Sequence, residues 1–211
     1  MVSKRRNRQR RTSRSSSYRE PKPRILVVTE GEVTEPEYLK GFEKAFRHSL
    51  IDVKYAKEHG LDPHSLVKIA KVHKEEAENQ AEREGDRNLR YNSVWCVFDI
   101  DDHRTVSDAK QMARANNIEL AISNPAIELW LLLHFQDSPG GQHRSMVSKM
   151  LKKHIPGYRK RVKFAQYEHG YDQAEQRAER LDEMANRDNE PHRNPSTGMY
   201  KLTRMIRVGQ V

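Results

Sequence analysis

The stretch RILVVTEGEVTEPEYLKGF, residues 24–42, contains the pattern that decides the fold. Its first six residues, RILVVT, are apolar on both faces of an extended chain, which is typical of a strand buried inside a parallel sheet. Aromatic side chains then recur at every fourth position of YLKGFEKAF, residues 38–46, as on one face of a helix. Thr34 and Glu37 have the spacing of a capping box at the start of that helix. The stretch therefore predicts a strand that turns directly into an amphipathic helix.

The same alternation of strand and helix continues along the chain. Further strands are predicted at residues 51–56, 93–100 and 118–123, and further helices begin at Asp62–Pro63, Ser107 and Asn124–Pro125. Four strands separated by helices predict an α/β fold with a mainly parallel four-stranded sheet flanked by helices. Three more helices are predicted at about 143–154, at about 170–187 and after Asn194–Pro195. We divide the chain into a basic arm (1–23), an α/β core (24–135) and a helical extension packed on the core (136–211).

The positive charge of the chain is concentrated at its N-terminus. Residues 1–24 contain ten Lys or Arg and one acid, which gives +9, the whole formal net charge, so residues 25–211 sum to zero. The arm has no apolar face and is expected to be disordered. Dense arginine favours phosphate contacts with nucleic acid, and the expected contact residues are Arg5, Arg6, Arg8, Arg10, Arg11 and Arg14. A solvated tail, an arm for an acidic partner and a transit peptide are the alternatives.

The apolar runs and the cysteine content of the sequence narrow the class of protein. No apolar run approaches the length of a membrane span, and the first residues contain no signal-peptide core, so we expect a cytoplasmic protein without a membrane partner. The single cysteine, Cys96, excludes an internal disulfide and a thiolate metal site. Because Cys96 lies in an apolar strand, we interpret it as a core residue.

Acidic residues follow three of the predicted strands. Ligands of an open parallel sheet bind outside the carboxyl ends of its strands, where Glu30, Asp99 and Asp101 are expected to converge. Their oxygens suit Mg²⁺ or Mn²⁺, and Gly31 would let a phosphate or a metal ion approach the backbone. Glu128 lies in a nearly all-apolar helix, where a carboxylate is costly without a partner. This set predicts metal-assisted phosphoryl transfer, with one or two metal ions left open.

Structural roles are the alternatives for several of these acids. Aspartates after a strand are common turn residues, so Asp99 and Asp101 taken alone are weak evidence for a metal. Glu35 and Glu37 lie in a first helical turn, where acids stabilise the helix dipole, and we assign them to the helix. Glu32 stays open between loop residue and ligand. His103 is interpreted as a solvated turn residue, with the orientation of an attacking water as the alternative.

Four ordered blocks of the sequence resemble a known family. VVTEGEVTEPEYLKGF, VFDIDDH, SNPAIELWLLLHF and HRNPST together are similar to the RloB family, which includes the second protein of the AbiL abortive-infection system. A strand ending in Glu-Gly and a strand ending in Asp-x-Asp also resemble the Toprim domain of topoisomerases and primases. The likeness covers about residues 24–207.

The resemblance implies a Toprim-like, divalent-metal-dependent nuclease of anti-phage defence with a partner ATPase. It implies that Glu30 is a general acid/base or metal ligand, that Asp99 and Asp101 bind the metal, and that Glu128 is a further ligand or base. Asn194 and Thr197 match the last block, and we interpret them as a helix cap, with a phosphate contact as the alternative.

Two other functions stay open. The chain could be a non-catalytic nucleic-acid-binding subunit of a defence ATPase, or a nucleotide-binding regulator, although it has no phosphate-cradling glycine loop. The residues do not choose between DNA and RNA such as tRNA, and they do not define the oligomeric state.

Overall fold

The sheet places the carboxyl ends of four parallel strands at one edge of the molecule. The computed structural model describes residues 22–46, 50–55, 62–100 and 106–209. The strands are β1 (Arg24–Thr29), β2 (Leu50–Tyr55), β3 (Ser93–Asp99), β4 (Glu119–Asn124) and β5 (Ser196–Thr197), in the spatial order β2-β1-β3-β4-β5. β1 to β4 are parallel, and β5 pairs antiparallel with β4. The predicted α/β class with a mainly parallel sheet is confirmed, and it agrees with a Toprim-like core.

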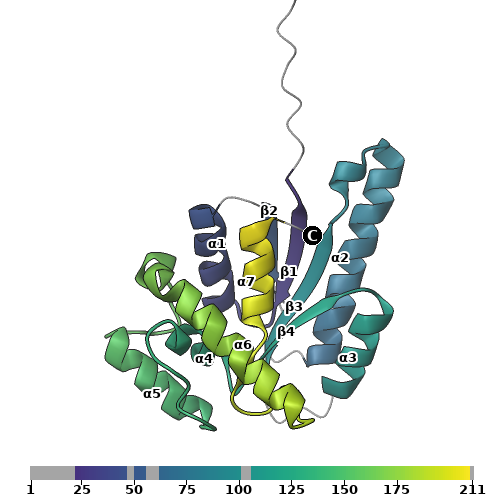
Figure 1. The fold of residues 1–211 in the computed structure, drawn as a ribbon. Helices are drawn as coiled ribbons and strands as arrows, with labels where there is room; N and C mark the ends of the chain where they lie inside the picture. Colours follow the sequence, from purple (N-terminus) through teal and green to yellow (C-terminus); the bar gives the residue numbers. More distant parts are fainter. Residues whose placement is uncertain (1–21, 47–49, 56–61, 101–105, 210–211) are drawn as a thin grey trace, which may run out of the picture.

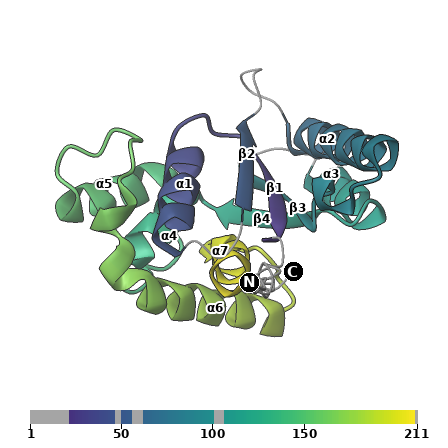
Figure 2. The same ribbon diagram turned by 90° about the horizontal axis from the view of Figure 1, so that it is seen from above.

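Helices cover both faces of this sheet (Figures 1 and 2). One face is covered by α1 (Thr34–Phe46), α4 (Ile127–Leu133), α5 (Arg144–His154), α6 (Tyr171–Arg187) and α7 (Met199–Val208), and the other by α2 (Pro63–Glu84) and α3 (Val106–Ala115). Short 3₁₀ helices are η1 (Arg87–Leu89), η2 (Phe164–Gln166) and η3 (Glu168–Gly170). Alternate residues of β1 enter the two cores, because side chains alternate across a strand: Ile25 faces α1 and Leu26 faces α2.

A buried aromatic cluster fixes α1 against α4. The ring of Tyr38 lies edge-on to Trp130 and His134, and its hydroxyl is 3.1 Å from His134 Nε2. His134 Nδ1 lies 2.9 Å from the Trp130 carbonyl and donates to it, so Nε2 accepts from Tyr38. Burial lowers the pKa of His134 to about 3 and keeps the ring neutral. These contacts set the relative positions of the two helices that begin at the carboxyl edge.

Two local predictions need correction, and one strand was not predicted. The capping box of Thr34 and Glu37 is wrong, because Thr34 Oγ1 donates to the Lys160 carbonyl and the Glu37 carboxylate accepts from the Val162 N–H. The helix cap at Asn194 is also wrong, because β5 follows it and α7 begins only at Met199. Thr197 lies in β5, but its hydroxyl does accept from the Met199 N–H at 3.4 Å. β5 makes a fifth strand that the sequence analysis did not predict. Asp62 does cap α2, as predicted.

No helix in the described part of the chain combines the length and the apolar character needed to cross a bilayer.

Candidate functional site

Glu30 and Asp99 lie side by side at the carboxyl edge of the sheet. β1 and β3 are adjacent parallel strands, and the Glu30 N–H extends their pairing by donating to the Val97 carbonyl at 3.0 Å. The Glu30 carboxylate then accepts a long hydrogen bond, 3.4 Å, from the Asp99 N–H. The structure therefore brings together these two residues, which are 69 positions apart in sequence.

Glu128 approaches the same edge from the first turn of α4. Every residue of this helix is buried, and Glu128 is only 9% exposed. The hydroxyl of Tyr158 donates to its Oε1 at 3.2 Å. A hydrogen-bonded partner of this kind is what a buried carboxylate requires, and no sequence pattern predicts that Tyr158 supplies it.

Glu35 joins this group, although the sequence analysis assigned it to the helix dipole. Its side chain is buried, with 5% of the residue exposed, and its Oε2 has no hydrogen-bond partner among the described residues. The carboxylate lies against Gly31, where an added Cβ would come within 2.1 Å of Oε2. A side chain at residue 31 would therefore force the Glu35 carboxylate to move. The approach of a phosphate or a metal ion to Gly31 stays a prediction. Glu37 lies in the same turn but is partly exposed, and its carboxylate contacts the Val162 N–H and Arg161.

The carboxylates repel one another in this partly desolvated site. Burial raises the pKa of Glu35 to about 7, and the charges of Glu128 and Glu30 add to that rise. Burial likewise raises the pKa of Asp99 well above its usual value, with further contributions from Glu35 and Glu128. These mutual effects identify Glu30, Glu35, Asp99 and Glu128 as one electrostatic group, which we call the carboxylate cluster.

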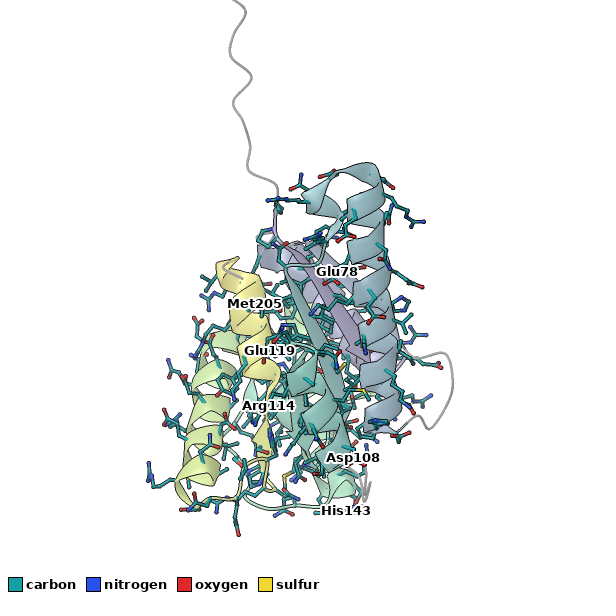
Figure 3. All side chains as sticks on the ribbon, turned by 90° about the vertical axis from the view of Figure 1, so that its right-hand side faces the viewer. Glu78, Asp108, Arg114, Glu119, His143 and Met205 are labelled. Carbon is teal, nitrogen blue, oxygen red and sulfur yellow. The ribbon has the colours of Figure 1, made fainter. Side chains whose placement is uncertain are left out.

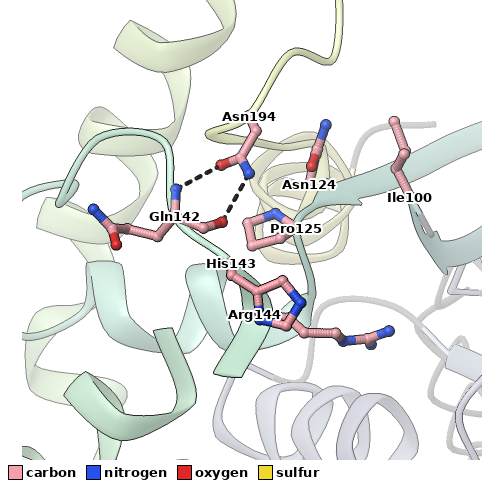
Figure 4. A pocket seen from close by; sticks show the side chains of 7 residues that line it. All are labelled: Ile100, Asn124, Pro125, Gln142, His143, Arg144 and Asn194. Carbon is pink, nitrogen blue, oxygen red and sulfur yellow. Dashed lines mark hydrogen bonds between the residues drawn. The ribbon is translucent and has the colours of Figure 1, made fainter. Parts of the chain in front are cut away.

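Arg144 contacts this cluster through Asp99. Its guanidinium Nη2 lies 3.1 Å from Asp99 Oδ2 and partly offsets the rise in the Asp99 pKa. Arg144 begins α5 and also lines a cavity of about 350 Å³ beside the cluster, together with Ile100, Asn124, Pro125, Gln142, His143 and Asn194 (Figure 4). The sequence analysis predicted neither the contact of Arg144 with Asp99 nor this cavity, because 45 residues separate the two side chains in the chain.

The walls of the cavity are held by hydrogen bonds across the chain. The Asn194 amide accepts from the Gln142 N–H and donates to the Gln142 carbonyl at 2.8 Å (Figure 4). His143 Nδ1 accepts from the Ser145 N–H at the start of α5, so the proton of the neutral ring is on Nε2. Asn194 therefore joins the loop before α5 to the segment before β5, which is a structural role different from the predicted cap.

Several predicted site residues lie outside the described residues. These are Asp101, His103 and the arginines of the arm, Arg5, Arg6, Arg8, Arg10, Arg11 and Arg14. Within the described ranges, no three His, Cys, Asp or Glu side chains are close enough to hold one metal ion. The oxygen-only donor set still fits a hard cation such as Mg²⁺. Oε2 of Glu35 is buried and has no hydrogen-bond partner in the part of the chain that the structure describes, and a cation would relieve the repulsion in the cluster.

Comparison with known proteins assigns the chain to a family. Neither the curated proteins nor the solved structures include a significant match to it. A family model described as RloB-like protein matches residues 25–206, which is most of the chain and includes all four members of the carboxylate cluster. The protein therefore belongs to the RloB-like family.

Proposed function

We propose that this protein is a divalent-metal-dependent nuclease that hydrolyses phosphodiester bonds of DNA or RNA in defence against phage. The observation that carries the proposal is the convergence of Glu30, Glu35, Asp99 and Glu128 at the carboxyl edge of a parallel sheet, where burial and mutual repulsion raise carboxyl pKa values. Perturbed acids of this kind are typical of functional sites.

In this proposal three members of the carboxylate cluster have a role in the reaction. Glu30 and Asp99, with Asp101 two residues after Asp99, would hold the metal ion, and Glu30 is also the expected general acid/base. Bound Mg²⁺ or Mn²⁺ would neutralise the charge that develops on the phosphoryl oxygens and lower the pKa of a bound water. Glu128, whose carboxylate accepts from the Tyr158 hydroxyl, would accept a proton from an attacking water or act as a further ligand.

The second candidate is a non-catalytic nucleic-acid-binding subunit of a defence ATPase. The observation in its favour is the ion pair between Arg144 and Asp99, which neutralises part of the cluster without a metal ion. An ATPase partner is expected under both proposals, as the family resemblance implies.

Replacement of Asp99 separates the two candidates. Purified full chain is incubated with plasmid, single-stranded DNA and tRNA, in Mg²⁺ or Mn²⁺ and in EDTA. We expect cleavage with metal, none in EDTA, and none with Asp99→Asn, because the amide removes a negatively charged oxygen ligand. Asp108→Asn is the matched control: it makes the same change on an exposed residue of α3 (Figure 3). Cleavage by Asp99→Asn at the wild-type rate would contradict the nuclease proposal, provided circular dichroism shows that both variants fold.

A further inference from the structure

A strongly basic segment lies beside the carboxylate cluster. Residues 152–163, KKHIPGYRKRVK, contain six Lys or Arg and no acid, so they carry +6. Residues 25–211 sum to zero, so the rest of that stretch carries −6 (0 − 6). All six cations are exposed: Lys152, Lys153, Arg159, Lys160, Arg161 and Lys163. The body of the protein is therefore neutral only on average, and its charge is segregated.

Buried side chains hold this segment in one place. Tyr158 and Val162 are buried between the exposed cations, and Phe164 follows them into the aromatic cluster around Tyr38. Such an alternation of buried anchors and exposed cations distinguishes the segment from a solvated loop. The lysines and arginines are thus presented from a fixed backbone.

The anchors connect the segment to the two helices that carry the cluster. The Lys160 carbonyl accepts from Thr34 Oγ1 at 2.9 Å, and the Val162 N–H donates to Glu37 Oε2 at 2.8 Å, both in the first turn of α1. Tyr158 donates directly to Glu128 at the start of α4. The charge of Lys160 also lowers the pKa of Glu35 in opposition to the effect of burial, which shows how near the basic segment lies.

We propose that residues 152–163 form a nucleic-acid docking surface that guides a phosphodiester strand to the carboxylate cluster. This inference rests on the proposed nuclease function and adds a second phosphate-binding region to the arm. Six like charges within twelve residues repel one another, and a polyanion relieves this repulsion while releasing its own counterions. Nucleic acid is favoured over an acidic protein because a phosphodiester can share a divalent cation with the adjacent carboxylates, as substrates of Mg²⁺ sites do.

The test uses the full chain and two variants with equal loss of charge. In the docking variant Lys152, Lys153, Arg159 and Lys163 are changed to Gln, while Lys160 and Arg161 are kept at the anchored positions. In the control variant Lys68, Arg83, Arg87 and Arg114 are changed to Gln. These four are exposed residues of α2, η1 and α3 on the other face of the sheet, and Arg114 is labelled in Figure 3. Urea denaturation first confirms that both variants are folded.

Binding is measured by fluorescence anisotropy in EDTA, where no metal-dependent cleavage occurs. Labelled single-stranded RNA, single-stranded DNA and duplex DNA are titrated between about 50 and about 300 mM KCl. We expect the docking variant to bind single strands at least about tenfold more weakly at about 100 mM salt. The slope of log K against log salt should be shallower by up to about 3 for four lost contacts at about 0.7 each. The control variant should stay close to wild type.

Two results would overturn the inference. The first is equal binding by the docking and control variants. The second is displacement of the nucleic acid by polyglutamate of equal charge at equal concentration, which would assign the surface to an acidic protein instead. Failure of the nuclease proposal is seen separately, because Asp99→Asn tests cleavage while the anisotropy experiment tests binding without metal.

Discussion

Glu35 is the residue whose environment most changes the expected chemistry. A first-turn glutamate usually lies at the surface and interacts with the helix dipole, but this one is buried against Gly31 with one oxygen unpaired among the described residues. Burial raises its pKa from 4.5 to about 7. The folded protein therefore binds this proton more tightly than the unfolded chain does, so the carboxyl destabilises the fold once it must ionise.

Glu35→Gln should remove this pH dependence. Below about pH 4.5 the carboxyl is protonated in both the folded and the unfolded state. Between about pH 4.5 and about pH 7 only the unfolded state loses the proton, so the stability of the wild type falls as the pH rises. A shift of this size corresponds to about 3 kcal/mol. In EDTA, the variant should gain about that much relative to wild type between about pH 4.5 and about pH 8, as measured by urea denaturation. A difference in unfolding free energy between variant and wild type that does not change with pH would contradict the assignment of this proton to Glu35. The same gain in Asp108→Asn would contradict it too.

At this scale the sequence identified the residues whose positions follow from strand ends. Glu30 and Asp99 could be placed together because parallel strands bring their carboxyl ends to one edge. Glu128 could be singled out because it is an acid in an apolar helix. Glu35, Arg144 and Tyr158 could not be placed: a first-turn acid, a helix-start arginine and a loop tyrosine have ordinary local roles, and only tertiary contacts give them others.

At the scale of elements, the first turn of α1 shows how a tertiary contact replaces a local one. Thr34 and Glu37 have the spacing of a capping box, yet both side chains contact residues 160–162 instead. Although burial alone would raise the pKa of Glu37, the Val162 N–H and Arg161 outweigh it and lower that pKa. Glu37 is therefore the main polar attachment of the basic segment to α1.

Glu37→Ala should loosen residues 158–163. The change removes the acceptor of the Val162 N–H and the ion pair with Arg161, which should lower the free energy of unfolding by about 1–3 kcal/mol. Trypsin cuts after Lys and Arg, so cleavage within the segment should become faster under native conditions, with the sites identified by mass spectrometry. Lys40→Ala, an exposed change on the same helix, is the control, and equal cleavage rates in the two variants would show that Glu37 does not anchor the segment.

At the scale of the whole molecule, the pattern of strands and helices predicted the α/β architecture. It did not predict that the last third of the chain adds a strand to the sheet and shares one hydrophobic core with α1 and α4. The four parallel strands and both helical layers follow from apolar periodicity. The two-residue β5 is too short to have a periodic signal, and its place beside β4 depends on pairing across 74 residues between Ser123 and Thr197. One hydrophobic core joins Phe42 and Trp130 to Ala178 and Leu202.

A fragment that ends at residue 135 should therefore fail to fold cooperatively. It would lose β5 and α7, expose the edge of β4, and uncover the apolar residues of α1 and α4 that pack against the C-terminal helices. We expect binding of a hydrophobic dye, aggregation and no sharp urea transition. Residues 22–211 serve as the comparison, and a cooperative transition of the shorter fragment would show that the core is independent.

The four carboxylates come from four separate elements that span about the first two thirds of the chain. Glu30 follows β1, Glu35 begins α1, Asp99 ends β3 and Glu128 begins α4, whose position depends on the aromatic cluster. A nascent chain still on the ribosome cannot assemble them until α4 has emerged and docked. Tyr158, which donates to Glu128, is synthesised 30 residues later still, so the complete site forms late in synthesis or after it.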